Sequence, residues 1–156
     1  MAEEIGIDGP LETALFHPEP VARDRAIYEL SQNMTPRVVH QCIGALDAQR
    51  DLTRRRALRI LSQLAPKHTE KPLSQALENR DCPIRMRTAA ARILTSIADE
   101  PIPSLAVGLL DADPRLRRAC ATAFAPQEAL FRALSDQDSE VVARAAQVIL
   151  RRNLDI

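Results

Sequence analysis

The sequence predicts an all-α protein, a right-handed superhelix of about five helical hairpins, on the basis of three observations. A small residue followed by an apolar one, with a large apolar residue three positions later, recurs roughly every 30 residues. Most of the 11 prolines fall between apolar segments, as expected for short helices with sharp boundaries. Aromatic residues make up only 3% of the 156 residues, so Ala and Leu must fill the core, which favours close helix packing.

The recurring pattern predicts the second helix of each hairpin. Its five copies are Ala26-Ile27 with Leu30, Ala57-Leu58 with Leu61, Ala90-Ala91 with Leu94, Cys120-Ala121 with Phe124, and Ala145-Ala146 with Ile149. A shorter apolar segment precedes each copy and predicts the first helix, at 10–16, 35–47, 69–79, 101–112 and 126–136. Neither helix can bury its apolar stripe alone, so stacked neighbours are expected to form the core.

Several of the first helices carry start signals. Thr35 precedes Pro36, and Thr69 stands three residues before Pro72, which predicts helix starts at both threonines. The expected organisation is a single repeat domain between an acidic, flexible N-terminal arm and a short C-terminal tail. The arm covers 1–9, the domain 10–152, the tail 153–156, and the repeats 10–33, 35–65, 69–98, 101–124 and 126–152.

Two segments show the repeat most clearly, LLDADPRLRRACATAF and LSDQDSEVVARAAQVIL. The pattern resembles HEAT repeats, in the short form similar to the HEAT-like repeats of phycobilisome lyases. The third repeat departs from it with Pro83 at the Asp position, and the first two have Glu19 and Arg50 there. The resemblance implies a fold and leaves the function open, because such arrays occur in scaffolds, lyase subunits, enzyme accessory proteins and DNA-repair proteins.

The resemblance also implies a structural role for one set of arginines. In HEAT-like repeats an Asp before the second helix and an Arg four residues later form a ladder between neighbouring repeats. In this chain the Arg position holds Arg23, Arg54, Arg87 and Arg117, and then Val142. These four arginines are expected to bond carboxylates and the exposed carbonyls of the turns.

Other arginines predict a basic surface on a chain whose formal net charge is zero. The second helices line the concave surface of such folds. The central second-helix segments carry net charges of +4 at 50–65 (five Arg, one Asp), +3 at 80–98 (four Arg, one Asp) and +2 at 113–124 (three Arg, one Asp). The residues expected to bind a partner in this concave groove are Arg55, Arg56, Arg59, Arg85, Arg92, Arg115 and Arg118.

The predicted function is a non-enzymatic adaptor or scaffold that binds an acidic segment of another protein. A solvated face of an Arg-rich chain is the plain alternative, since 19 of the 21 basic residues are Arg. The resemblance to lyases implies another, an accessory subunit of a bilin-lyase-type enzyme that holds a linear tetrapyrrole or its acceptor protein. The neutral net charge and the lack of aromatic platforms argue against nucleic acid as the partner.

No motif in the sequence predicts catalysis, a metal site or a cofactor. His17, His40 and His68 are scattered, and the sequence contains no CxxC, no HExxH and no Gly-rich phosphate loop. Cys42, Cys82 and Cys120 are expected to be reduced thiols of a cytoplasmic protein, with Cys82 the most accessible.

Two further expectations concern the chain's surroundings. No apolar run is long enough to predict a membrane span. Weakly capped ends of the repeat array would permit a homodimer through those ends.

Overall fold

The computed structural model describes residues 8–154, and these form ten α-helices and one short 3₁₀ helix with no strand. The predicted all-α class is therefore confirmed for this part of the chain. Residues 1–7, most of the expected arm, lie outside the described residues, as do residues 155–156 of the expected tail. Contacts divide the chain into two compact units, unit 1 (Met1–Pro72) and unit 2 (Leu73–Ile156).

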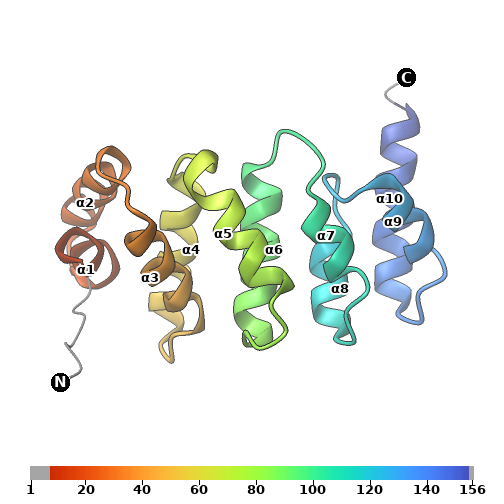
Figure 1. Ribbon diagram of the computed structural model, residues 1–156, viewed down its shortest axis with the longest axis horizontal. Helices are drawn as coiled ribbons and strands as arrows, with labels where there is room; N and C mark the ends of the chain where they lie inside the picture. Colours follow the sequence, from red (N-terminus) through yellow and green to blue (C-terminus); the bar gives the residue numbers. More distant parts are fainter. Residues whose placement is uncertain (1–7, 155–156) are drawn as a thin grey trace. The chain divides into compact units, whose positions relative to one another are not determined.

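The helices of unit 1 pack in pairs (Figure 1) and share one apolar core. Helix α1 (Gly9–Phe16) packs along α2 (Pro20–Gln32) and contacts α4 (Asp51–Gln63). Helix α3 (Pro36–Gly44) and the 3₁₀ helix η1 (Ala45–Asp47) pack on the same α4, and α5 (Pro66–Glu78) begins within the unit. The apolar side chains buried most completely are Leu11, Cys42, Ala57, Ile60 and Leu61.

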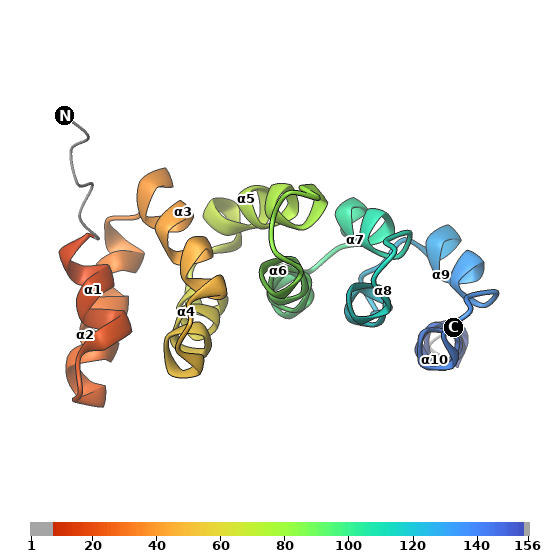
Figure 2. The same ribbon diagram turned by 90° about the horizontal axis from the view of Figure 1, so that it is seen from below.

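Unit 2 has two layers of helices (Figure 2). One layer holds the end of α5, α7 (Pro103–Gly108) and α9 (Gln127–Ala133). The other holds α6 (Ile84–Ile97), α8 (Pro114–Cys120) and α10 (Ser139–Leu154), with α8 packed between its two neighbours. The core between the layers contains Leu73, Leu77, Ile93, Leu94, Leu105, Leu116, Leu130 and Val141, all 0% exposed.

Prolines and side-chain caps define where the helices begin. Pro20, Pro36, Pro103 and Pro114 each occupy a first helical position, where a missing N–H costs no hydrogen bond. The Thr35 hydroxyl accepts a hydrogen bond from the Val38 amide at 3.3 Å, as its N-cap position predicts.

Helix α5 differs from the prediction at its start. It begins at Pro66, three residues before the expected start at Thr69, and Pro72 lies inside it. Pro66 suits a first helical position, so the helix starts there, and Pro72 removes one hydrogen bond from its interior. Thr69 is fully buried, and within the described residues its hydroxyl has no hydrogen-bond partner.

Helix α8 also differs, because it ends at Cys120 and not near Phe124. The backbone turns at Ala121, and the Phe124 carbonyl accepts a hydrogen bond from the Ile102 amide at 2.8 Å. This hydrogen bond ties the segment after α8 to the start of α7. The two helices approach closely at Gly108, where an added Cβ would collide with the Cys120 Sγ.

No helix within residues 8–154 combines the length and the apolar character needed to cross a bilayer.

Candidate partner-binding site

The three partner-binding candidates of unit 1 are all engaged within that unit. Arg55 pairs with Asp51 one turn earlier on α4, at 2.6 Å, and Arg59 pairs with Asp24 of α2 at 3.2 Å. Arg56 is half-buried and donates to the Leu15 carbonyl at 2.6 Å, at the end of α1. Arg56 therefore holds two helices of unit 1 together.

The two candidates on α8 are also paired. Arg115 forms an ion pair with Asp113, the N-cap residue of its own helix, at 2.7 Å. Arg118 reaches the start of α10, where it pairs with Asp138 and, at 3.1 Å, with Glu140. The charge that these arginines bring to α8 is neutralised by carboxylates beside them.

Arg85 and Arg92 of α6 are different. Both are exposed, and neither has a hydrogen bond or ion pair within the described residues 8–154. They stand seven residues apart, so they project from one face of α6, about 10 Å apart along its axis. Helix α6 contains no acidic residue. We refer to Arg85 and Arg92 as the α6 arginine pair.

The arginines expected to be structural bond the turns before their helices. Arg23 donates to the carbonyls of His17 and Pro18, at 2.9 and 2.6 Å. Arg54 does the same to Ala48 and Gln49, at 2.7 and 2.9 Å. Each guanidinium thereby supplies donors to carbonyls that the turn itself leaves unused.

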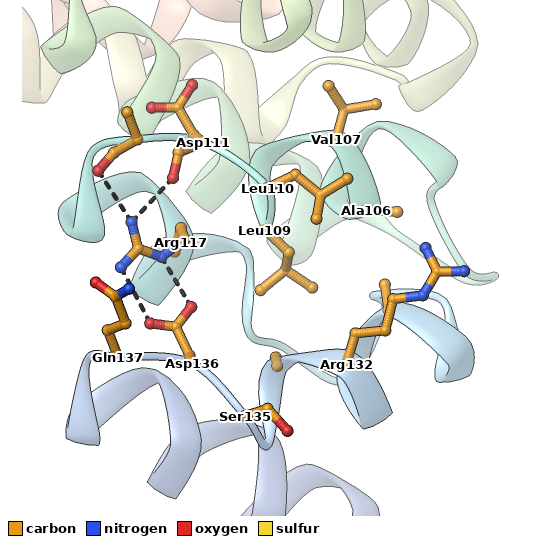
Figure 3. A pocket seen from close by; sticks show the side chains of 13 residues that line it. Ala106, Val107, Leu109, Leu110, Asp111, Arg117, Arg132, Ser135, Asp136 and Gln137 are labelled. Carbon is orange, nitrogen blue, oxygen red and sulfur yellow. Dashed lines mark hydrogen bonds and ion pairs between the residues drawn. The ribbon is translucent and has the colours of Figure 1, made fainter.

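In unit 2 such arginines also reach forward to the next helix pair. Arg87 bonds the Leu77 carbonyl at 2.8 Å and Asp111 at 2.7 Å. Arg117 forms two parallel bonds to Asp136, at 2.8 and 3.0 Å, besides two turn carbonyls (Figure 3). The side chains of both pairs are at most 15% exposed.

The acceptors differ from the ones that the resemblance implies. They are Asp111 and Asp136, which precede the expected ladder residues Asp113 and Asp138 by two positions. Asp113 and Asp138 instead cap the starts of α8 and α10. Asp111 and Asp136 lie in the turns that follow α7 and α9, within reach of Arg87 and Arg117 on the preceding second helices. Asp138 does both, because it caps α10 and also accepts hydrogen bonds from Arg118 of α8.

Charge pairing shifts the titration of these groups. Hydrogen bonds from Arg117 hold the pKa of Asp136 below its ordinary value, against the opposing effect of burial. Hydrogen bonds from Arg118 lower the pKa of Asp138 to about 2. Burial of Asp111 opposes ionisation, yet hydrogen bonds from the Asp113 amide and Arg87 outweigh it and lower its pKa. All three carboxylates are therefore ionised at neutral pH.

A pocket of about 570 Å³ lies between α7 and α9, and the sequence analysis did not predict it. Its wall includes Ala106 and Val107 of α7 and Leu110 of the turn after it, while Arg117 and Asp136 close one end (Figure 3). Arg132 stands at the edge of the pocket and pairs with Glu128 at 2.5 Å. The sequence signal was the row of small residues on the two first helices, Ala106, Ala129 and Ala133, which leave the space open.

Two of the three cysteines, Cys42 and Cys120, are buried. Burial raises the pKa of Cys42 and of Cys120 to about 12, so both are protonated and unreactive at neutral pH. Cys82 is half-exposed, and all three thiols are free. Among the residues that the structure describes, no three His, Cys, Asp or Glu side chains gather as metal ligands would.

Comparison with known proteins adds no family or activity to this geometry. The chain matches no model of a protein family, and no curated protein matches it.

Proposed function

We propose that this protein is a non-enzymatic adaptor that binds an acidic segment of another protein on the outward face of α6. The observation that carries the proposal is the α6 arginine pair, whose two exposed guanidinium groups have no partner within the described residues. Charge-assisted hydrogen bonds from arginine to carboxylate are among the strong ones, and the fork of the guanidinium adds directionality.

The ion pairs of Arg115 and Arg118 on the neighbouring α8 limit the proposed binding site to the α6 arginine pair. Arg115 and Arg118 already hold Asp113, Asp138 and Glu140, so an incoming carboxylate would have to displace an existing partner there. At Arg85 and Arg92 no ion pair within the described residues has to be broken first. The favoured ligand carries two carboxylates about 10 Å apart, the axial spacing of the pair.

We also propose a repeat type for the fold. The helix pairs are short HEAT-like repeats, similar to those of phycobilisome lyases, and stack as a right-handed α-solenoid. The forward bonds of Arg87 and Arg117 support this, because each ties one helix pair to the next in the same way. We also place the protein in the cytoplasm, a proposal that its three free cysteines support.

Affinity capture from host lysate tests the proposal, with wild-type protein and an Arg85→Glu/Arg92→Glu variant as baits. The matched control is Arg80→Glu/Arg151→Glu, which makes the same change in net charge at two other exposed arginines of unit 2. Proteins and nucleic acids are identified in each eluate.

The expected result is a protein retained by the wild type and by the control and lost by the α6 variant. A synthetic peptide of its acidic segment should then bind the wild type at least tenfold more tightly than the variant. Equal capture by all three baits would remove the α6 arginine pair from the binding site. If the baits retained only nucleic acid, and if this binding fell steeply as salt was added, the protein would be a nucleic-acid-binding protein and not an adaptor.

A further inference from the structure

The pocket between α7 and α9 has an apolar middle between two polar ends (Figure 3). Leu109 and Leu110 lie between Arg117 at one end and Arg132 at the other. The volume of about 570 Å³ lies within the range of roughly 300–1,000 Å³ that small-molecule sites occupy. Within the described chain, the lining contains alanine, valine and leucine but no aromatic ring. The middle therefore suits an alkyl chain better than a flat ring that needs a stacking partner.

Apolar side chains on one wall of the pocket are open to water. Val107 is 44% exposed and Leu110 is 69% exposed, although both are large apolar residues. A ligand that covers them removes apolar surface from water, which favours binding. The helices on both sides of the pocket belong to unit 2, so the opening is bordered by neighbours that the chain itself supplies.

The polar groups at the closed end already bind one another. Arg117 forms two parallel bonds to Asp136, whose carboxylate also accepts a hydrogen bond from the Asp138 amide at 2.8 Å. Asp111 lines the same end and accepts a hydrogen bond from Arg87 at 2.7 Å. A ligand carboxylate at this end would meet two aspartates whose arginines are already paired, and burying it without a cation is costly.

Arg132, at the other end, is held much more loosely. Its only ion pair within the described residues is with Glu128, one turn earlier on α9, and the two side chains are 65% and 81% exposed. An exposed pair with this spacing contributes little to stability, so an anion in the pocket can replace Glu128 at small cost. The guanidinium can then hold a carboxylate through two parallel hydrogen bonds.

We infer that the pocket binds an aliphatic monocarboxylate. The carboxylate pairs with Arg132, and the alkyl chain covers Val107, Leu109 and Leu110 and ends before Asp136. A chain with a carboxylate at both ends is disfavoured, because its second carboxylate reaches the closed end. This pocket is separate from the α6 arginine pair, so the inference does not depend on the proposed adaptor role.

Isothermal titration calorimetry of the full chain with decanoate tests the inference. One decanoate is expected to bind per chain. Decanedioate, which has a carboxylate at each end of the same carbon chain, should bind at least about fivefold more weakly. Arg132→Gln should weaken decanoate binding about tenfold, because the carboxylate loses its charge-assisted hydrogen bonds. The matched control is Arg151→Gln, at an exposed arginine of α10 outside the pocket lining, which should bind like the wild type.

A second pair of variants tests the apolar middle. Ala129→Leu extends a side chain of the lining into the pocket and should weaken decanoate binding about tenfold. Ala143→Leu makes the same change at an exposed position of α10 outside the lining and should leave binding unchanged. Far-UV circular dichroism checks that all four variants fold.

Four results would each overturn the inference. The first is the lack of saturable decanoate binding up to ~1 mM, where contacts become very weak. The second is an affinity of Arg132→Gln equal to that of the wild type, and the third is undiminished binding in Ala129→Leu. The fourth is decanedioate binding as tight as that of decanoate.

Discussion

Two sets of arginines in unit 2 differ in what they touch. Arg87 and Arg117 face inward, with side chains 7% and 15% exposed, and each bonds a carboxylate of the following helix pair. Arg85 and Arg92 stand on the same α6 as Arg87, yet they face outward and contact no acid within the described residues. The face of the helix on which an arginine stands thus separates one that holds helix pairs together from exposed ones that are available for the proposed binding role.

The largest expected difference in stability is between alanine variants of Arg87 and of Arg85, which lie two residues apart on α6. Arg87→Ala leaves Asp111 buried without its cation and should lower the free energy of unfolding by about 3–5 kcal/mol. Arg85→Ala should change it by no more than about 0.5 kcal/mol. Chemical denaturation of both variants measures the difference, and similar losses for the two would contradict the division.

A smaller loss of stability is expected when a buried glycine, Gly108, is replaced by alanine than when Arg87 is replaced. Gly108→Ala drives a Cβ into the Cys120 Sγ between α7 and α8, and overpacking of this kind costs about 1–3 kcal/mol. The control is Gly44→Ala, where the added Cβ meets no atom within 4 Å. Thermal unfolding should therefore show a lower midpoint for Gly108→Ala and an unchanged or higher one for Gly44→Ala.

The pH dependence of stability tests whether the ion pair between Arg117 and Asp136 stabilises the fold. The pKa of Asp136 is lower in the folded protein than the ordinary Asp value of 3.8, so the stability that its ion pair contributes is complete above that value. The contribution is lost as the pH falls from about 4 toward the folded pKa. Arg117→Gln removes the main cause of the shift, so the unfolding free energy of this variant should fall less steeply below pH 4. A slope equal to that of the wild type would show that the pair does not stabilise the fold.

The smallest effect on stability is expected for the α6 arginine pair. Arg85→Ala/Arg92→Ala should unfold within about 0.5 kcal/mol of the wild type, because exposed side chains without partners contribute little. Circular dichroism during urea titration checks this. A larger loss would reveal a structural contact and weaken the argument for a binding role.

The sequence predicted the helical class and the hydrogen bonds of Arg23 and Arg54 to turn carbonyls, because both depend on residues close together in the chain. It did not predict the partner of Arg118, since Asp138 lies 20 residues away and meets it only after α8 and α10 pack. The early end of α8 was not predicted either, and the hydrogen bond from the Ile102 amide to the Phe124 carbonyl joins residues 22 positions apart, which no local pattern encodes.

The candidate site shows the same limit. Seven arginines were expected to bind a partner, and charge counting could not separate them. The distinction required the positions of the acidic residues, such as Asp24 beside Arg59 and Glu140 beside Arg118. Helix α6 has no acid of its own, which the sequence does show. What packing adds is that none from elsewhere in the described chain reaches Arg85 or Arg92.

The most direct test of the account measures the affinity of the captured partner's acidic segment for wild-type protein and for Arg85→Glu/Arg92→Glu, with both shown to be equally stable. We expect at least a tenfold loss of affinity in the variant at unchanged stability. Equal affinity at equal stability would contradict it, and the outward arginines of α6 would then be no more than a solvated surface.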